Sequence, residues 1–409
     1  MGTIRLFDEK PYDNEFTAEV IEIDKRGDKT AFVLDRTLFF PESGGQTADR
    51  GVIRVGDDAS YFSELEVYDV RIEDDIIYHF VDGDTSDLKV GDKAYGIIDF
   101  DYRFSNMQQH SGEHIFSGLC KRYYGCNNVG FHLSDNEVTF DFDRKLTEDE
   151  IYDIEDKVNK VIYENREIIA FYPTEEEIES LDYRSKKEIE DRVRLVEIEG
   201  IDLCACCAPH VKRTGEIGLL KVVDFLNYKG GVRISILCGR RALEHYKKLD
   251  GITRDISRTL SASRDDLASE VKKLADSIKE AEYKRLEFEK RYLDLIFDSI
   301  ALNIPLVDSV ITDKAIILKL NDLSNKSLRN MVNKLKSEHP DRLVGTFSQS
   351  EKGYFFIIGS ESIDCNKVAA YMREKNGAKG GGSSDMIQGT IDNELSASDI
   401  EILCDNVML

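Results

Sequence analysis

Two short motifs constrain the fold of this chain most, because together they carry the ligands for one metal ion. The first is His-Ser-Gly-Glu-His at residues 110–114 and the second is Cys-Cys-Ala-Pro-His at residues 206–210. Histidines four residues apart lie on one face of a helix, and a Cys-x3-His segment adds a thiolate and a third imidazole. Three nitrogens and one sulfur suit tetrahedral Zn²⁺, whereas Ca²⁺ and Mg²⁺ prefer oxygen ligands. The sequence therefore predicts one Zn²⁺ per chain, with four ligands: His110, His114, Cys206 and His210.

The choice of cysteine rests on spacing. Cys204, Cys206 and Cys207 lie close together, but only Cys206 stands four residues before His210. A neighbouring thiol could still compete for the ion or change its sensitivity to oxidation. The remaining histidines have no partner at ligand spacing, so we expect them to be structural or exposed; they are His79, His132, His245 and His339.

Two further motifs extend the pattern along the chain. Residues 39–46 end in Gly44-Gly45-Gln46, and residues 376–382 end in three glycines, while the second metal motif continues through residues 211–218. With these four motifs in order, the chain resembles the editing domain of alanyl-tRNA synthetase and its free-standing AlaX relatives of the long type, followed by a DHH-associated C-terminal domain. It departs from the family twice. Cys207-Ala208-Pro209 replaces the usual two glycines and threonine, and Ser383 stands where a basic residue often follows the third glycine.

The resemblance implies an enzyme that hydrolyses the ester joining a wrong amino acid, serine or possibly glycine, to alanine tRNA. We expect it to act in trans, because the chain begins at the editing barrel with no room for an aminoacylation domain. Zinc would either activate a water or hold the substrate in place. The resemblance places a set of residues around the aminoacyl group: Thr37, Gly44, Gly45, Gln46, Ser111 and, as a group that orients a ligand or is simply solvated, Glu113.

Selection against alanine follows from hydrogen bonding. A hydroxyl such as that of Thr37 could pair with the hydroxyl of serine, and it would lose that partner when alanine binds. A buried polar group left without its partner costs about 1–3 kcal/mol.

Charge argues against a nucleic-acid partner at first sight, because the net charge of the 409-residue chain is −24. Whole-chain charge does not describe a local patch, however, and basic residues gather after the second metal motif. The predicted tRNA contacts are Lys212, Arg213, Arg233, Arg240 and Arg241, and in the C-terminal region Lys379, Gly380, Gly381 and Gly382. Taken alone, the three glycines would form a flexible loop.

The pattern along the chain predicts a multidomain α+β protein. Alternating runs at residues 18–23 and 30–34 indicate a small β-barrel or sandwich in residues 1–99, and Thr147 with Glu150 forms a capping box that starts a helix. Residues 100–248 would form the zinc-containing editing domain. Residues 249–298, with apolar residues at every seventh position from Leu260 to Leu295, predict a helical or coiled-coil linker. Residues 299–409 would form a small α/β DHH-associated domain that binds tRNA or, with the linker, makes a homodimer.

The N-terminus lacks a signal-peptide pattern, no run of eighteen apolar residues occurs, and the eight cysteines do not form a secreted disulfide framework, so we expect a cytoplasmic protein with no membrane contact.

Two other functions stay open. One is a noncatalytic tRNA-binding or dimerisation protein, because four protein ligands close a tetrahedral shell as in structural zinc sites. The other is a hydrolase of a different ester or amide.

Overall fold

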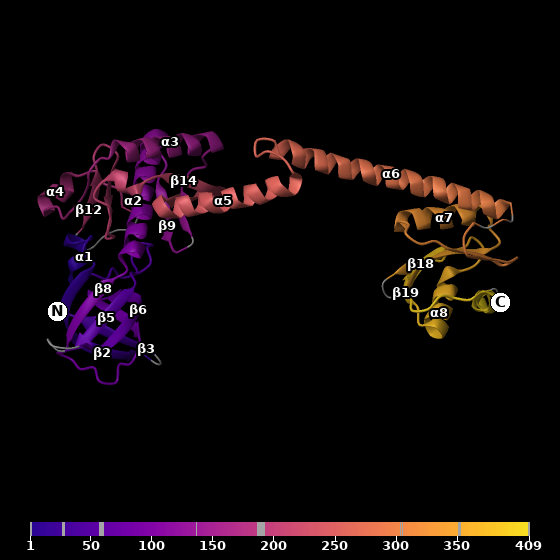
Figure 1. Ribbon diagram of the computed structural model, residues 1–409, viewed down its shortest axis with the longest axis horizontal. Coiled ribbons are helices and arrows are strands. Elements are labelled where there is room, and N and C mark those ends of the chain that lie inside the picture. Colours follow the sequence, from indigo (N-terminus) through magenta and orange to yellow (C-terminus); the bar gives the residue numbers. More distant parts are fainter. Residues whose placement is uncertain are drawn as a thin grey trace. The chain divides into compact units, whose positions relative to one another are not determined.

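The computed structural model describes residues 2–26, 29–56, 61–135, 137–185, 193–302, 304, 306–350 and 353–407. The chain divides into two compact units, Met1–Arg254 and Asp255–Leu409 (Figure 1). Both units mix helices and strands, as predicted. No helix among the described residues has the length and apolar character needed to cross a membrane.

The first unit begins with a closed six-stranded barrel, which confirms the barrel prediction over the sandwich. Its strands, in order around the barrel, are β2 (Glu15–Arg26), β3 (Lys29–Leu34), β7 (Ile76–Asp82), β6 (Tyr61–Glu73), β5 (Gly51–Gly56) and β8 (Lys93–Ile98). Side chains that alternate along these strands fill the interior, among them Phe32, Ile53 and Leu65. Short β1 (Ile4–Arg5) pairs with β4 (Arg36–Thr37), and α1 (Leu6–Glu9) lies between them in the chain.

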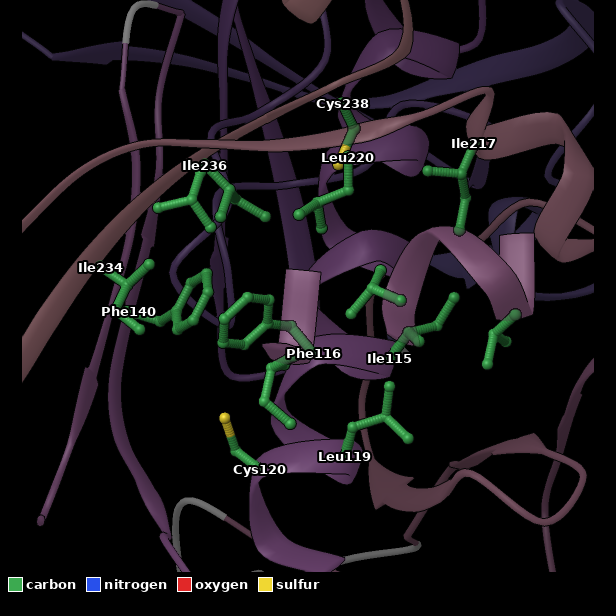
Figure 2. Packing of buried hydrophobic residues seen from close by; sticks show 14 of the residues in the cluster. Ile115, Phe116, Leu119, Cys120, Phe140, Ile217, Leu220, Ile234, Ile236 and Cys238 are labelled. Atoms are coloured by element: carbon green, nitrogen blue, oxygen red, sulfur yellow. The ribbon is translucent and has the colours of Figure 1, made fainter. Parts of the chain in front are cut away.

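A second layer of the same unit surrounds one long helix, α2 (Phe100–Tyr124). Every residue of α2 from Asn106 to Cys120 is buried. One sheet contains, in order, β14 (Leu220–Tyr228), β15 (Gly231–Cys238), β10 (Val138–Phe142) and β9 (Asn128–Leu133), and another contains β11 (Ile168–Phe171), β12 (Leu195–Ile198) and β13 (Asp202–Ala205). Figure 2 shows Phe116 of α2 beside Phe140 of the larger sheet, with their ring centroids 5.1 Å apart.

The remaining helices of this layer are α3 (Glu148–Glu164), α4 (Glu175–Ser180) and the 3₁₀ helix η1 (Thr214–Ile217). Thr147 caps α3, with both hydrogen bonds of the predicted capping box present. The apolar stripe of α3 is buried, as its period of 3.6 residues requires.

A buried ion pair attaches α2 to the barrel. The Arg103 guanidinium binds both carboxylate oxygens of Asp49, and it also donates to the Leu38 carbonyl at 2.6 Å. Asp49 in turn accepts from the Phe40 backbone N–H at 2.6 Å. Both charged side chains are fully buried, so their hydrogen bonds replace the water that each loses on folding. The pair fixes the segment after β4 against the start of α2.

Two helices follow, α5 (Gly239–Leu260) and α6 (Leu267–Ala301). The predicted helical linker is therefore helical, but it is interrupted at residues 261–266, where the seven-residue repeat was expected to continue. Ser261 has a φ of +51°, and the Ser263 hydroxyl bonds Asp266 at the start of α6. Three apolar side chains of the repeat on α6 lie at the surface of the second unit: Leu274, Phe288 and Leu295.

The C-terminal fold is a six-stranded sheet covered by helices. Its strand order is β16 (Ser309–Ile311), β17 (Ala315–Lys319), β18 (Leu343–Ser350), β19 (Gly353–Gly359), β21 (Met386–Ile391) and β20 (Lys379–Gly382), and its helices are α7 (Asn325–Glu338), α8 (Cys365–Asn376) and α9 (Ala397–Val407). The three glycines are thus an edge strand, not a flexible loop. A Cβ at Gly380 would lie 2.2 Å from the Gln388 carbonyl oxygen, which explains the glycine in this close pairing.

We predict that the buried ion pair contributes far more to the free energy of unfolding than an exposed one. Arg103→Met leaves Asp49 charged and buried, so the free energy of unfolding should fall by about 3–5 kcal/mol. Arg54→Met removes an ion pair with Glu64 on the exterior of the same barrel and should cost less than about 1 kcal/mol. Urea unfolding followed by circular dichroism compares them, and equal losses would contradict the assigned role of Arg103.

Candidate metal centre

The four predicted ligands converge. His110 and His114 come from α2, and Cys206 and His210 from the segment after β13; their ligand atoms all lie within 4.8 Å of one another. The Cys206 Sγ is 3.5 Å from His110 Nε2 and 3.3 Å from His210 Nε2. Tetrahedral zinc, with Zn–N near 2.0–2.1 Å and Zn–S near 2.3 Å, sets nitrogen and sulfur ligands about 3.5 Å apart. The residues therefore fit a zinc ion.

The Nδ1 atom of each of the three histidines faces a polar side chain. The Nε2 atoms of His110 and His210 face the Cys206 thiol and can bind the metal. Such partners fix the tautomer of a ligand histidine and its ring orientation. The contacts are His110 Nδ1 to Gln46 Oε1 at 2.8 Å, His210 Nδ1 to Ser111 Oγ at 2.9 Å, and His114 Nδ1 to Asp202 Oδ2 at 3.2 Å.

Asp202 connects His114 to a partly buried cation, Arg184. Arg184 donates to both Asp202 oxygens, at 2.6 and 2.7 Å. Burial alone would raise the pKa of Asp202, but the hydrogen bonds from Arg184 and His114 outweigh it and keep that pKa below its usual range. Asp202 is thus a carboxylate that holds the imidazole of His114. Neither Asp202 nor Arg184 stands in a motif, so the sequence offered no signal for this pair.

The three clustered cysteines differ in environment. Burial raises the pKa of the Cys206 thiol, which a bound metal would counteract by stabilising the thiolate. Cys204 is buried, and its thiol contacts the Ala205 carbonyl at 3.6 Å, whereas Cys207 is exposed and lies 3.5 Å from the Ser43 hydroxyl. Cys204 also lies near His114 and Asp202, but Asp202 is already bound by Arg184.

The Gly-Gly-Gln segment places Gln46 against His110. Ser43 and Gln46 exchange backbone hydrogen bonds across a two-residue turn, with φ of +61° at Gly44 and +84° at Gly45. Positive φ at both central positions favours glycine. A Cβ at Gly45 would lie 2.4 Å from the Phe131 carbonyl oxygen, and the Gly45 carbonyl accepts from Leu133 N at 2.7 Å. The glycines thus bring the turn close to β9 and orient Gln46.

The other predicted substrate residues have partners of their own. The Thr37 hydroxyl lies 2.8 Å from His79 Nε2 and accepts from Phe39 N at 3.0 Å, inside the barrel. Burial lowers the pKa of His79 to about 4, so this imidazole is neutral at pH 7 and accepts from Thr37. The Ser111 hydroxyl is paired with the His210 imidazole, at 2.9 Å from its Nδ1 atom. Glu113 is fully buried and accepts from Ser117 and Asn128, so it is not solvated.

The predicted tRNA contacts of the first unit make contacts within the chain, whereas those of the second unit are exposed. Arg233 makes a bidentate ion pair with Asp141. Arg241 donates to the Ser105 hydroxyl, the Asn106 side-chain oxygen and the Ser134 carbonyl. Arg213 pairs with Glu167 at the surface, and Lys212 lies over the Tyr12 ring. The Arg240 side chain remains 70% exposed, beside Glu244. In the C-terminal unit, Lys379 and the three glycines are exposed along β20.

Family models match three parts of the chain. Residues 7–102 match tRNA synthetases class II (A), residues 193–254 match the second additional domain of threonyl and alanyl tRNA synthetases, and residues 312–407 match the DHHA1 domain. These matches cover the barrel, the Cys-x3-His segment and the C-terminal sheet.

Curated relatives agree with the family models. An alanine–tRNA ligase of Ignicoccus hospitalis is 31% identical over 93% of this chain and 40% of its own length. The alanyl-tRNA editing protein AlaX-L of Pyrococcus horikoshii is 32% identical over 61% of each chain. The chain thus spans 40% and 61% of these two relatives. A solved structure, the C-Ala domain from Aquifex aeolicus alanyl-tRNA synthetase, matches 24% of this chain and 97% of its own at 18% identity and a TM-score of 0.22.

We predict that the intact chain retains one zinc ion after dialysis. Cys206→Ala removes the only sulfur ligand and should lose the metal, whereas Cys365→Ala, a buried cysteine of the C-terminal unit, should keep it. Asp202→Asn should weaken zinc binding by about 10–100-fold, because it removes the carboxylate that holds His114. Mass spectrometry of bound metal and a chelator titration measure both effects. Retention of zinc by Cys206→Ala, or its loss in Cys204→Ala, would contradict the ligand set.

Proposed function

We propose that this chain, which is of the AlaX editing type with a DHHA1 domain, hydrolyses mischarged alanine tRNA. The substrate would be tRNA carrying serine or, second, glycine. The observation that supports this most is the buried set of three imidazoles and one thiol directly beneath the Gly-Gly-Gln turn.

Hydrolysis of an aminoacyl ester needs little chemical activation by the protein. An aminoacyl ester is already activated, so water attacks the carbonyl carbon, the bond to the ribose oxygen breaks, and the amino acid and the tRNA hydroxyl leave. A bound zinc ion would supply either polarisation of an oxygen or a fixed position for the substrate. Gln46 is suited to the substrate side, because its Oε1 is held by His110 while its Nε2 makes no hydrogen bond within the described structure. That amide N–H group can donate to an ester oxygen.

Selectivity for serine is the part that depends on Thr37. Its hydroxyl pairs with the neutral His79 in the barrel wall, so a bond from Thr37 to serine would require the hydroxyl to exchange that partner. We infer that Thr37 is the residue that distinguishes serine from alanine.

We predict rapid release of serine from seryl-tRNA(Ala), with alanyl-tRNA(Ala) spared, and loss of release after zinc removal. Gln46→Ala should reduce kcat/KM by about tenfold or more, because it removes a donor to the ester. Release of labelled amino acid measures the rates, with Cys365→Ala as the control that keeps wild-type rates. A folded, zinc-loaded protein that releases none of serine, glycine or alanine would favour the noncatalytic tRNA-binding function. Release from other tRNAs but not from tRNA(Ala) would favour a different ester.

We also propose that α6 joins two copies of the chain. Its exposed apolar side chains recur at heptad positions, among them Val271, Leu274 and Ile278, each about half exposed. We predict a concentration-dependent dimer by light scattering, and a monomer for the double variant Leu274→Lys and Ile278→Lys. The matched control, Lys272→Ala and Lys279→Ala on the same helix, should remain dimeric. A single-chain mass at every concentration would contradict the dimer.

A further inference from the structure

Two adjacent thiols follow β13, and only one of them reaches the metal cluster. The Cys206 Sγ lies within 4.8 Å of the ligand nitrogens of the three histidines. Cys207 is exposed instead, and its Sγ lies 3.5 Å from the Ser43 hydroxyl. A thiolate from either cysteine would suit zinc, so the chemistry of the side chains does not distinguish them. The backbone that carries the two cysteines must therefore determine which thiol points inward.

One arginine binds this backbone on both sides of Cys207. Arg194 Nη1 donates to the Cys206 carbonyl and to the Ala208 carbonyl, each at 3.0 Å. One guanidinium nitrogen can serve both carbonyls because it carries two N–H groups. Two carbonyls that converge on one nitrogen bend the backbone around the residue between them. The Cys207 side chain is thus left on the outer side of the bend.

Arg194 occupies this position because the pairing of β12 with β13 continues past the ends of both strands. Leu195 lies opposite Ala205 in this antiparallel pair. The next residues outward are Arg194 and Cys206, and the Cys206 backbone N–H donates to the Arg194 carbonyl at 3.0 Å. The backbone of Arg194 therefore holds Cys206 directly, and its side chain holds the bend that follows.

Both ends of this arrangement are fixed. The Arg194 side chain is only 6% exposed, and its Nε lies 3.7 Å from Asp8 Oδ1 of α1. The other Asp8 oxygen accepts from the Tyr172 hydroxyl at 2.9 Å. Ala208, at the far end of the bend, is fully buried in the apolar core of the barrel. A buried guanidinium with a carboxylate and two carbonyls as partners has little freedom to turn, so the bend is rigid.

We infer that Arg194 selects Cys206 over Cys207 as the sulfur ligand. It is a positioning residue, because it contacts the backbone of the ligand segment and not the ligand atoms. Loss of its guanidinium releases the carbonyls on either side of Cys207, and the segment can then turn either thiol toward the three histidines. The inference concerns the metal site and does not depend on the proposed hydrolysis.

The test removes the guanidinium from a chain that lacks the Cys206 thiol. Co²⁺ added to the metal-free chain reports a bound thiolate by its sulfur-to-cobalt charge-transfer absorption. We expect this absorption in the wild type and its loss in Cys206→Ala. The double variant Arg194→Met with Cys206→Ala should regain it through Cys207, and the further change Cys207→Ala should abolish it again.

The matched control is another arginine that donates to a backbone carbonyl. Arg166 Nη1 donates to the Glu199 carbonyl at 2.8 Å, outside the metal segment. Arg166→Met with Cys206→Ala should therefore remain without the absorption. This control separates the loss of any carbonyl contact from the loss of the contacts around Cys207.

A second form of the test protects the fold. Arg194→Met leaves the Asp8 carboxylate without its cation, and a buried charge without a partner destabilises a protein. Adding Asp8→Asn removes that charge and keeps an oxygen for Tyr172. Far-ultraviolet circular dichroism checks that each variant is folded before Co²⁺ is added.

The outcomes are distinct. Thiolate absorption through Cys207 in the Arg194→Met chain, and not in the Arg166→Met chain, supports the inference whether or not the wild type hydrolyses an ester. If folded Arg194→Met chains lacking Cys206 show no such absorption, or if Arg166→Met restores it equally, Arg194 supports the fold only and the inference fails. A wild type that binds no Co²⁺ overturns the metal site and the inference together.

Discussion

The polar face of α2 is buried, and the rest of the first unit is arranged around that fact. A helix with histidines, a glutamate and serines in the interior can be stable only if each polar group finds a partner, because water cannot reach it. The partners come from segments far away in the sequence: Gln46 for His110, Asp202 for His114, and Asn128 for Glu113. The candidate metal site is therefore built from the same hydrogen bonds that allow α2 to be buried.

The barrel contributes to the site through one short connection. Asp49 is bound to Arg103 at the start of α2, and Gln46 lies three residues earlier, at the end of the glycine turn. A rigid ion pair next to a turn that only glycine adopts without strain holds Gln46 in register with His110. This explains how a loop, which in most proteins is mobile, can position a side chain against a metal site.

The sequence predicted the four metal ligands better than the side chains that hold those ligands in place. The spacing of His110 and His114 and of Cys206 and His210 was enough to place four ligands in one cluster, because helix geometry and a short loop decide it. Asp202, Arg184 and Arg194 stand in no motif, and their contacts form only when distant segments pack. The interruption at residues 261–266 was not predicted, because the seven-residue repeat of apolar residues continues across it. The glycine strand β20 was wrongly predicted as a loop because glycine-rich composition does not reveal a pairing partner such as Gln388.

X-ray absorption at the zinc edge of the metal-loaded chain identifies the atoms bound to the metal. We expect three nitrogen neighbours at about 2.0–2.1 Å and one sulfur neighbour at about 2.3 Å. Cys206→Ala should remove the sulfur shell while Cys207→Ala leaves it. A first shell without sulfur, or with two sulfurs, would contradict the assignment of His110, His114, Cys206 and His210 as the ligands.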